Sequence, residues 1–508
     1  MNWEEGSHID YRRLFAEQSL LCPTDANRYS DLLKGEKKVK SKLIALGMVL
    51  AILMTACAPA APVVQTVVVT QPAAVQTVVV TQAPAVQTVV VTQPPVVQTV
   101  VVTQPPATAP VEISWMVFET PALTASFWDN VIANGVKDSG VPGLTVKKLV
   151  TPGPDRTAYA KQLIAAGTEP DIMQSISTQD FVDSGLLQPW DEQWVKDHFI
   201  LPMATSINGK IWQAPTNSQI IPFVFYNKDL FKQAGVDVPK TWADFQNVVT
   251  KLKAAGIKPI QIVGAGDGGW ASAFTLEGII SADVLGTTPD WAQKRKAGTV
   301  KFTDADMTAA FAKYKWLVDN GAFDKADLGV GFADANTAFG SGKAAMYFMG
   351  SWFLQYDAVK NAKFEPGVFL FPRDDGKQIV PFSVGGGIHI SSKSAHPAET
   401  MAFAEAVALS PSFMKTLIET DGAISMVKGM TVEKYGATVT NVYKEAMNFV
   451  GQDGLTNVDA FDWVNNDYAL APGMQGEINK SAQAIVTGTD VKSELERLDK
   501  AWDLASQK

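Results

Sequence analysis

Apolar and polar positions follow different patterns along this chain, and the pattern typical of a folded domain begins at residue 111. Val111–Phe118 alternates apolar and polar residues and then becomes apolar, which predicts a β-strand. Tyr159–Ala166 has the apolar spacing of an amphipathic helix, and Gly167 is placed to end it. Pro170–Met173 is a second predicted strand. Strands and helices therefore alternate from the start of this region.

The same alternation continues toward the middle of the chain. Ile220–Tyr226 is an apolar run, and Asp229–Ala234 has helical spacing and precedes Gly235. Thr241 is placed to cap a further helix, with Asp244 at its third position. Short strands that alternate with helices predict an α/β fold with largely parallel sheets. Because 508 residues are too many for one core, we expect two or three structural units.

The segment before this region has the pattern of an export signal. Residues 34–42 are basic, and the apolar stretch Leu43–Ala56 is shorter than the ~20 residues that span a bilayer as a helix. A basic segment, a short apolar stretch and small residues before a cleavage point are typical of a secretory signal peptide. We therefore expect a signal peptide over residues 34–56.

Cys57 follows this apolar stretch directly. The sequence Leu53-Met-Thr-Ala-Cys57 resembles the bacterial lipobox, although Met54 stands where that motif usually has leucine. The resemblance implies a lipoprotein whose mature N-terminus is a diacylated Cys57. The alternative is an ordinary signal peptide followed by an incidental cysteine.

Residues 1–33 do not fit this plan, because Met1 lies far upstream of the basic segment and the next methionine is Met48. A signal peptide should begin near its basic segment. We expect residues 1–33 to be a non-native or disordered extension, with translation starting downstream at a non-AUG codon. A real cytoplasmic extension is the alternative.

Residues 57–110 contain no charged residue and repeat the unit Val-Gln-Thr-Val-Val-Val-Thr-Gln. The repeat has a period of eleven residues, well below the roughly 20–50 residues of solenoid repeats. Valine and threonine favour extended backbone, and the proline after each unit interrupts sheet pairing. The pattern predicts a stiff, extended, low-complexity stalk that acts as a tether. In the alternative, the valine and threonine runs pair as β-strands or aggregate.

The composition narrows the possible functions. The net charge of -9, from 43 Lys plus Arg and 52 Asp plus Glu, disfavours a nucleic-acid partner, because phosphate binding needs a basic surface. The four histidines are scattered and give no metal-ligand or triad spacing, so we expect neither a metal site nor a cofactor. The 13 tryptophans provide aromatic faces of the kind that stack on sugar rings.

Several short segments occur in the order typical of one family. Across residues 111–508 the chain resembles family 1 extracellular solute-binding proteins, the sugar-binding components of bacterial ABC importers. The segments that carry the resemblance are Ala165–Gly167, Pro170–Ile172, Tyr226–Phe231, Pro239–Trp242 with Phe245, Phe339–Met346, Gly350–Trp352, Gly385–Gly387, Ile390–Ser391 and Glu477–Trp502.

The resemblance implies a two-lobed, periplasmic-binding-protein-like α/β fold, with a hinge and a ligand cleft between the lobes. Lobe 1 would comprise residues 111–221 plus 384–432, and lobe 2 residues 222–383 plus 433–508. A ligand that touches both lobes favours the closed state over the open one.

The function implied by the resemblance is capture of a mono- or oligosaccharide and its delivery to the permease subunits of an ABC importer. The protein would be a monomer without enzymatic activity, lipid-anchored at the extracytoplasmic face of the cell membrane. A sugar-sensing or adhesion lipoprotein remains an alternative, as does binding of a non-sugar solute. A carbohydrate-active enzyme would need a pair of carboxylates in a cleft, and no motif singles one out.

Three segments provide the main candidate ligand-binding residues. Gly350, Ser351 and Trp352 form a predicted turn after a strand, where free N–H groups can meet ligand oxygens, although Trp352 could instead pack in the core. The segment Gly264–Gly269 formally fits a dinucleotide-binding motif, but no second strand carries the required acid. The resemblance to the solute-binding family implies instead that this segment delivers Trp270 to the cleft.

Gly386 and Gly387 would let backbone approach a sugar closely, or would form a bulge where the chain crosses between lobes. The remaining candidates have ordinary alternatives as loop or core residues; they are Glu119, Ser175, Asn217 and Trp463.

Overall fold

The computed structural model describes residues 64–70, 75–82, 85–92, 97–103, 110–120, 122–153, 155–451 and 454–506. The chain divides into two compact units, residues 1–107 and 108–508. The expected extension 1–33, the expected signal peptide 34–56 and Cys57 lie outside the described residues. The expectations for those three segments therefore stay predictions.

The first unit contains the valine and threonine repeats as paired strands. Strand β2 (Val75–Gln82) pairs antiparallel with β3 (Ala85–Thr92), and β1 (Val64–Thr70) pairs antiparallel with β4 (Val97–Thr103). The predicted unpaired, extended stalk is therefore wrong for these residues, and the pairing alternative holds. The prolines stand between the strands in the sequence, so each repeat keeps an uninterrupted run of seven or eight residues for its ladder.

The second unit begins with a five-stranded sheet in the order β6-β5-β7-β17-β8. Strand β5 lies parallel to β6 and β7, whereas β17 is antiparallel to β7 and β8. Its strands are β5 (Val111–Val117), β6 (Leu144–Val150), β7 (Ile172–Gln174), β8 (Leu187–Gln188) and β17 (Ile388–Ser391). The helices of this part are α2 (Ala125–Asp138), α3 (Arg156–Ala165), α4 (Thr178–Val182), α5 (Glu192–His198) and α13 (Pro397–Leu409).

A second sheet has the order β13-β14-β12-β15. Its strands are β12 (Phe223–Asn227), β13 (Ile260–Gln261), β14 (Met346–Met349) and β15 (Pro366–Phe369). The helical elements of this part are α6 (Lys228–Ala234), α7 (Trp242–Ala254), η1 (Gly266–Ala271), α8 (Phe274–Ile280), η2 (Ser281–Leu285), α9 (Trp291–Lys296), α10 (Ala305–Asp319), η3 (Lys325–Gly329), α11 (Phe332–Gly340), η4 (Ser351–Gln355), α12 (Asp357–Lys360), α16 (Asn441–Met447), α17 (Met474–Thr487) and α18 (Val491–Ala505).

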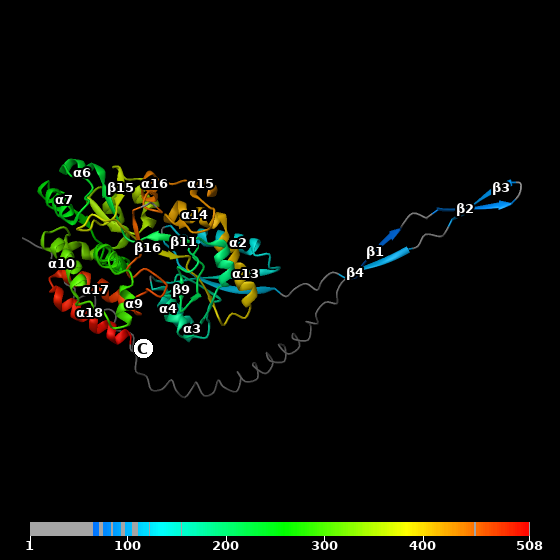
Figure 1. The fold of residues 1–508 in the computed structure, drawn as a ribbon, viewed down its shortest axis with the longest axis horizontal. Coiled ribbons are helices and arrows are strands. Elements are labelled where there is room, and N and C mark those ends of the chain that lie inside the picture. Colours follow the sequence, from blue (N-terminus) through cyan, green and yellow to red (C-terminus); the bar gives the residue numbers. More distant parts are fainter. Residues whose placement is uncertain are drawn as a thin grey trace, which may run out of the picture. The chain divides into compact units, whose positions relative to one another are not determined.

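A third sheet, in the order β18-β11-β16-β19, joins the two parts. Strand β11 (Asn217–Ile220) leads into β12 of the second sheet, and β16 (Ile379–Gly385) leads into β17 of the first. In Figure 1, helices α7, α10 and α17 lie on one side of β11 and β16, and α2, α3 and α13 lie on the other. The remaining elements are β9 (Ser206–Ile207), β10 (Lys210–Ile211), α14 (Pro411–Asp421), β18 (Ile424–Ser425), α15 (Val432–Tyr435) and β19 (Thr456–Asp459).

This arrangement is the expected two-lobed α/β fold, with lobe 1 built on the first sheet and lobe 2 on the second. The residue boundaries of the lobes stay a prediction. The expectation of largely parallel sheets is wrong, because most ladders of the second unit are antiparallel. Strands β12 and β17 enter their sheets from the other lobe, and so run against their neighbours.

Local sequence signals at helix ends are confirmed. Thr241 and Asp244 form a reciprocal capping box at the start of α7. Gly235 ends α6 in the left-handed conformation, at φ 61°, where a side chain would be strained.

Within the described part of the chain, no single helix is both long and apolar enough to cross a bilayer. Helices α13 and α14, which meet at a bend of 54°, satisfy that criterion only when they are taken together.

Candidate functional site

Three tryptophans from distant segments lie together in lobe 2. The ring centroids of Trp270, Trp352 and Trp463 are 5.7–6.1 Å apart, and each side chain keeps part of its surface exposed. Phe274 lies beneath them, with its ring 5.2 Å from Trp463 and 6.0 Å from Trp352. We call Trp270, Trp352 and Trp463 the tryptophan cluster. All three are candidates from the sequence, and the structure brings them together.

The turn that carries Trp352 is fixed by its two preceding residues. A side chain at Gly350 would overlap the indole ring of Trp352, so the glycine lets the ring fold back over the backbone. Ser351 is fully buried; its hydroxyl donates to the side chain of Gln219 and accepts a hydrogen bond from the Ile220 N–H at 3.2 Å. Ser351 therefore attaches the turn to β11 of the joining sheet.

The glycine-rich segment before Trp270 packs closely on a neighbouring helical turn. A Cβ atom at Gly264 would come within 2.7 Å of the Leu328 backbone, so the segment packs closely on η3. It leads into η1, which places the Trp270 ring 5.2 Å from Phe332. The acid considered for a dinucleotide site, Asp283, instead forms an ion pair with Lys313 at 2.8 Å.

Trp463 is held by a buried acid. Its indole N–H donates to Glu277 at 2.8 Å, and its carbonyl oxygen accepts a hydrogen bond from Ser383. Because Glu277 is fully buried, its pKa is raised to about 8. Burial and the neighbouring Glu277 also raise the pKa of Asp462, a non-glycine residue with left-handed backbone at φ 68°. Trp463 is thus hydrogen-bonded to one desolvated carboxyl group, whose charge interacts with that of Asp462.

In lobe 1, polar groups meet at the end of β7 and the start of β17. Ser175 has left-handed backbone at φ 54°, and its N–H donates to the Gly387 carbonyl at 2.7 Å. The side chain of Gln213 accepts from the Gly387 N–H at 2.8 Å, and that of Gln174 donates to the Gly386 carbonyl at 3.0 Å. Gln174 Oε1 and Gln213 Nε2 are buried without a partner among the described residues. These two unpaired amide atoms leave the loop with hydrogen-bonding capacity.

The glycines of this loop are explained by neighbouring protein atoms. A side chain at Gly386 would overlap Thr216, and one at Gly387 would overlap Ser175. The two residues connect β16 of the joining sheet with β17 of lobe 1. This arrangement favours the alternative in which the two glycines let the chain cross between the lobes. A contact between their backbone and a ligand stays a prediction.

His389 is hydrogen-bonded to the same loop. Burial lowers its pKa to about 4, so the imidazole is neutral at pH 7. Its Nδ1 lies 3.1 Å from the Gly387 carbonyl and its Nε2 lies 2.8 Å from the Thr178 hydroxyl. Since a carbonyl can only accept, Nδ1 carries the proton and Nε2 accepts from Thr178.

Two further candidates lie at the edges of this arrangement. Asn217 begins β11 opposite Gly385, and its amide donates to Thr216 at 3.1 Å. Glu119 lies just beyond the end of β5 with its side chain exposed. Neither residue joins the tryptophan cluster.

Polar residues that the sequence did not predict as part of the site lie where α14 meets the joining sheet. Gln219 donates to the Asp421 carbonyl at 3.1 Å and lies 3.4 Å from its carboxylate. Burial raises the pKa of Asp421 to about 7. Burial, and to a smaller extent the charge of Asp421, raises the pKa of Tyr356, whose ring packs on Phe332. No local pattern marks these residues, because only the fold brings them together.

Arg156 was also missed, although it lies beside a predicted residue. It begins α3, and its Nε donates to the Ser175 carbonyl at 3.0 Å. Its guanidinium lies 4.2 Å from the centre of the Phe118 ring.

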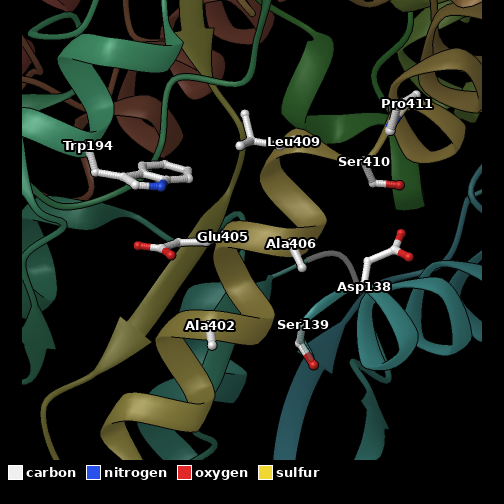
Figure 2. Close-up of a pocket in the computed structure, with 9 residues that line it drawn as sticks. All are labelled: Asp138, Ser139, Trp194, Ala402, Glu405, Ala406, Leu409, Ser410 and Pro411. Carbon is white, nitrogen blue, oxygen red and sulfur yellow. The ribbon is translucent and has the colours of Figure 1, made fainter. Parts of the chain in front are cut away.

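A separate hollow of about 400 Å³ lies on the outer surface of lobe 1, between α2, α5 and α13 (Figure 2). The Trp194 ring and the Glu405 carboxylate lie on one side of it, and Asp138 and Ser139 lie on the other. It includes none of the predicted ligand-binding residues. Among the described residues, no group of three or more potential metal ligands is close enough to hold a metal ion.

The tryptophan cluster offers aromatic surface, and the loop at Ser175 and Gly387 offers backbone and amide groups. Such a combination suits a ligand with apolar ring faces and many hydroxyl groups.

Comparison with known proteins agrees with this picture. Residues 129–411 match the bacterial extracellular solute-binding protein family. The multiple sugar-binding protein of Streptococcus mutans is 27% identical over 309 residues, 58% of this chain and 70% of that protein. The alpha-glucosides-binding periplasmic protein AglE of Rhizobium meliloti is 27% identical over 187 residues, 32% of this chain and 40% of that protein.

Solved structures show the same fold. A chitin oligosaccharide binding protein superimposes with a TM-score of 0.66 at 23% identity, covering 78% of this chain and all of that one. The binding protein RafE in complex with raffinose superimposes with a TM-score of 0.61 at 20% identity, with the same coverage. The family match covers more than half of the chain and these structures share its two-lobed fold, so the protein belongs to the bacterial extracellular solute-binding protein family.

Proposed function

We propose that this protein captures a mono- or oligosaccharide outside the cytoplasm and delivers it to the permease subunits of an ABC importer. The observation that carries the proposal is the tryptophan cluster, in which Trp270, Trp352 and Trp463 come from three separate segments. Sugar rings have apolar faces that stack on indole, and indole loses little conformational freedom on binding.

The relatives support a sugar ligand. The names of the Streptococcus mutans and Rhizobium meliloti proteins state that they bind sugars and alpha-glucosides, respectively. In our proposal, the ligand contacts the tryptophan cluster in lobe 2 and the Ser175–Gly387 loop in lobe 1. Contact with both lobes would favour the closed state.

The proposed location follows from the N-terminal sequence. Cys57 would be lipidated and would hold the protein, as a monomer, at the extracytoplasmic face of the membrane, and residues 57–110 would act as a tether. The paired repeats β1 to β4 would shorten this tether relative to a fully extended chain, because each antiparallel pairing folds the backbone back on itself.

A thermal-shift screen of the purified protein against mono- and oligosaccharides tests the proposal. A sugar that binds only the folded state stabilises it by about 2.7 kcal/mol at a hundredfold excess over the dissociation constant. We expect a large shift with one class of sugar, which is recovered unchanged afterwards. Failure to shift with any sugar of a broad panel would contradict carbohydrate binding, and consumption of the sugar would indicate an enzyme.

A further inference from the structure

Arg156 lies where a ligand in lobe 1 would be bound. Its guanidinium reaches two positions at the carboxyl ends of parallel strands: Ser175 just beyond β7 and Phe118 just beyond β5. Ligands of open α/β sheets bind beyond the carboxyl ends of the strands. Arg156 therefore lies at the same edge of the first sheet as Ser175, a predicted ligand contact.

Among the described residues Arg156 forms no ion pair, and the nearby Asp155 opposes only part of the effect of burial on the pKa of Arg156. In the part of the chain that the structure describes, no carboxylate lies within ion-pair distance of its guanidinium. The adjacent Asp155 is exposed and its carboxylate instead caps α3, accepting from the Ala158 N–H at 2.8 Å. On the same helix, Lys161 does have a partner, Asp180, at 2.5 Å.

The guanidinium is also partly withdrawn from water. Burial lowers the pKa of Arg156, and only its Nε has a protein acceptor among the described residues. Its terminal N–H groups are left without one, and they form the planar fork that matches the two oxygens of a carboxylate. A partly desolvated cation of this kind is best satisfied by an anion.

We propose that the ligand is an acidic sugar whose carboxylate binds the Arg156 fork in lobe 1, while its uncharged rings stack on the tryptophan cluster. This inference rests on the proposed function and adds the class of sugar. Because the net charge of -9 disfavours the approach of anions, a local cation would favour binding of such a ligand.

Calorimetric titration of the purified full chain tests the inference with three probes: oligogalacturonate, the matching neutral galactose oligosaccharide, and galactose 1-phosphate. We expect oligogalacturonate to bind at least tenfold more tightly than the neutral sugar, and the difference to shrink at high salt because ions screen charge. If galactose 1-phosphate binds more tightly than oligogalacturonate, and if that binding also depends on Arg156, the ligand group would be a phosphate and the proposed carboxylate would be wrong.

Three variants locate the effect. Arg156→Gln should remove the preference for the acidic sugar, and Arg156→Lys, which keeps the charge but not the fork, should retain part of it. Lys161→Gln removes an already paired charge from the same helix and should keep the whole preference.

Two further results would overturn the inference. Equal binding of acidic and neutral sugars to the unaltered protein would do so while leaving carbohydrate binding intact. A preference that survives in Arg156→Gln would show that another residue recognises the acid. Binding of no sugar at all would instead contradict the proposed function on which the inference rests.

Discussion

At Gly350 the absence of a side chain determines where an aromatic ring lies. The Trp352 indole occupies the space that a Cβ atom at Gly350 would need. The same ring contributes to the tryptophan cluster, with its centroid 5.9 Å from that of Trp270. A single backbone position therefore controls the geometry of the candidate site.

We predict that Gly350→Ala weakens sugar binding at least tenfold, or ~1.4 kcal/mol, because the added methyl group displaces the Trp352 ring. Gly329→Ala is the matched control, since a Cβ atom at exposed Gly329 meets no neighbour within 4 Å. Calorimetric titration with the sugar compares the affinities of the two variants. Unchanged affinity in Gly350→Ala would show that the position of Trp352 does not matter for binding.

The buried acid beneath Trp463 makes stability depend on pH. The pKa of Glu277 is raised from its ordinary value of 4.5 to about 8, so between these values the folded state holds a proton that the unfolded state has lost. The contribution of Glu277 is complete below pH 4.5 and is lost as the pH rises through about 8.

We therefore predict that the free energy of unfolding falls more steeply between pH 5 and pH 8 in the unaltered protein than in Glu277→Gln. Glutamine cannot ionise but keeps an acceptor for the Trp463 indole. Urea unfolding at both pH values measures the difference. Parallel pH profiles for the two proteins would mean that Glu277 does not hold this proton.

At the scale of elements, residues 460–472 connect the tryptophan cluster with lobe 1. We call this segment the bridging loop. Besides Trp463 it carries Asn466, whose side chain is buried and donates to Ala204 at 3.1 Å and to Asp459 at 3.0 Å. Asp467 accepts from the Asn208 N–H at 3.0 Å. The loop thus ties a wall of the candidate site to the β9–β10 hairpin.

We predict that Asn466→Ala lowers stability by roughly 1–3 kcal/mol, because it removes a buried amide and leaves its two half-buried partners without these hydrogen bonds. It should also weaken sugar binding, since the bridging loop carries Trp463. Asn134→Ala is the control, because the Asn134 amide makes one exposed hydrogen bond, to Ser412. Loss of this bond should lower the free energy of unfolding by less than ~0.5 kcal/mol. Equal stability and affinity in the two variants would show that the bridging loop carries no such role.

The elements that the sequence predicted well are those set by local signals. The strand expected at Val111–Phe118 is β5, and the helix expected to end before Gly235 is α6, because patterning and caps act within a few residues. The joining sheet could not be predicted in this way, since β16 pairs with β19, whose residues follow 77 positions later (Ile379 opposite Thr456). In the stalk, local propensity for extended backbone was right, but it does not specify whether two strands pair.

The residues of the candidate site also differ in whether the sequence could predict them. Trp270, Trp352 and Trp463 could be named from the sequence because aromatic residues at turns are conspicuous. Arg156 and Asp421 could not, because their importance depends on partners from other elements.

At the scale of the whole molecule, both lobes contribute to the proposed binding. Lobe 2 supplies the aromatic surface, lobe 1 supplies Arg156 and the loop with Ser175 and Gly387, and the joining sheet connects them. A binding protein needs such a division, because a ligand can favour closure only if it interacts more strongly with the closed arrangement.

The most direct measurement is a calorimetric titration of the protein, and of the double variant Trp270→Ala/Trp352→Ala, with the sugar that stabilises it most. We predict one ligand per chain for the unaltered protein and an affinity at least a hundredfold lower, or ~2.7 kcal/mol, for the folded double variant. Equal affinities would contradict the account, since the sugar would then bind somewhere other than the tryptophan cluster.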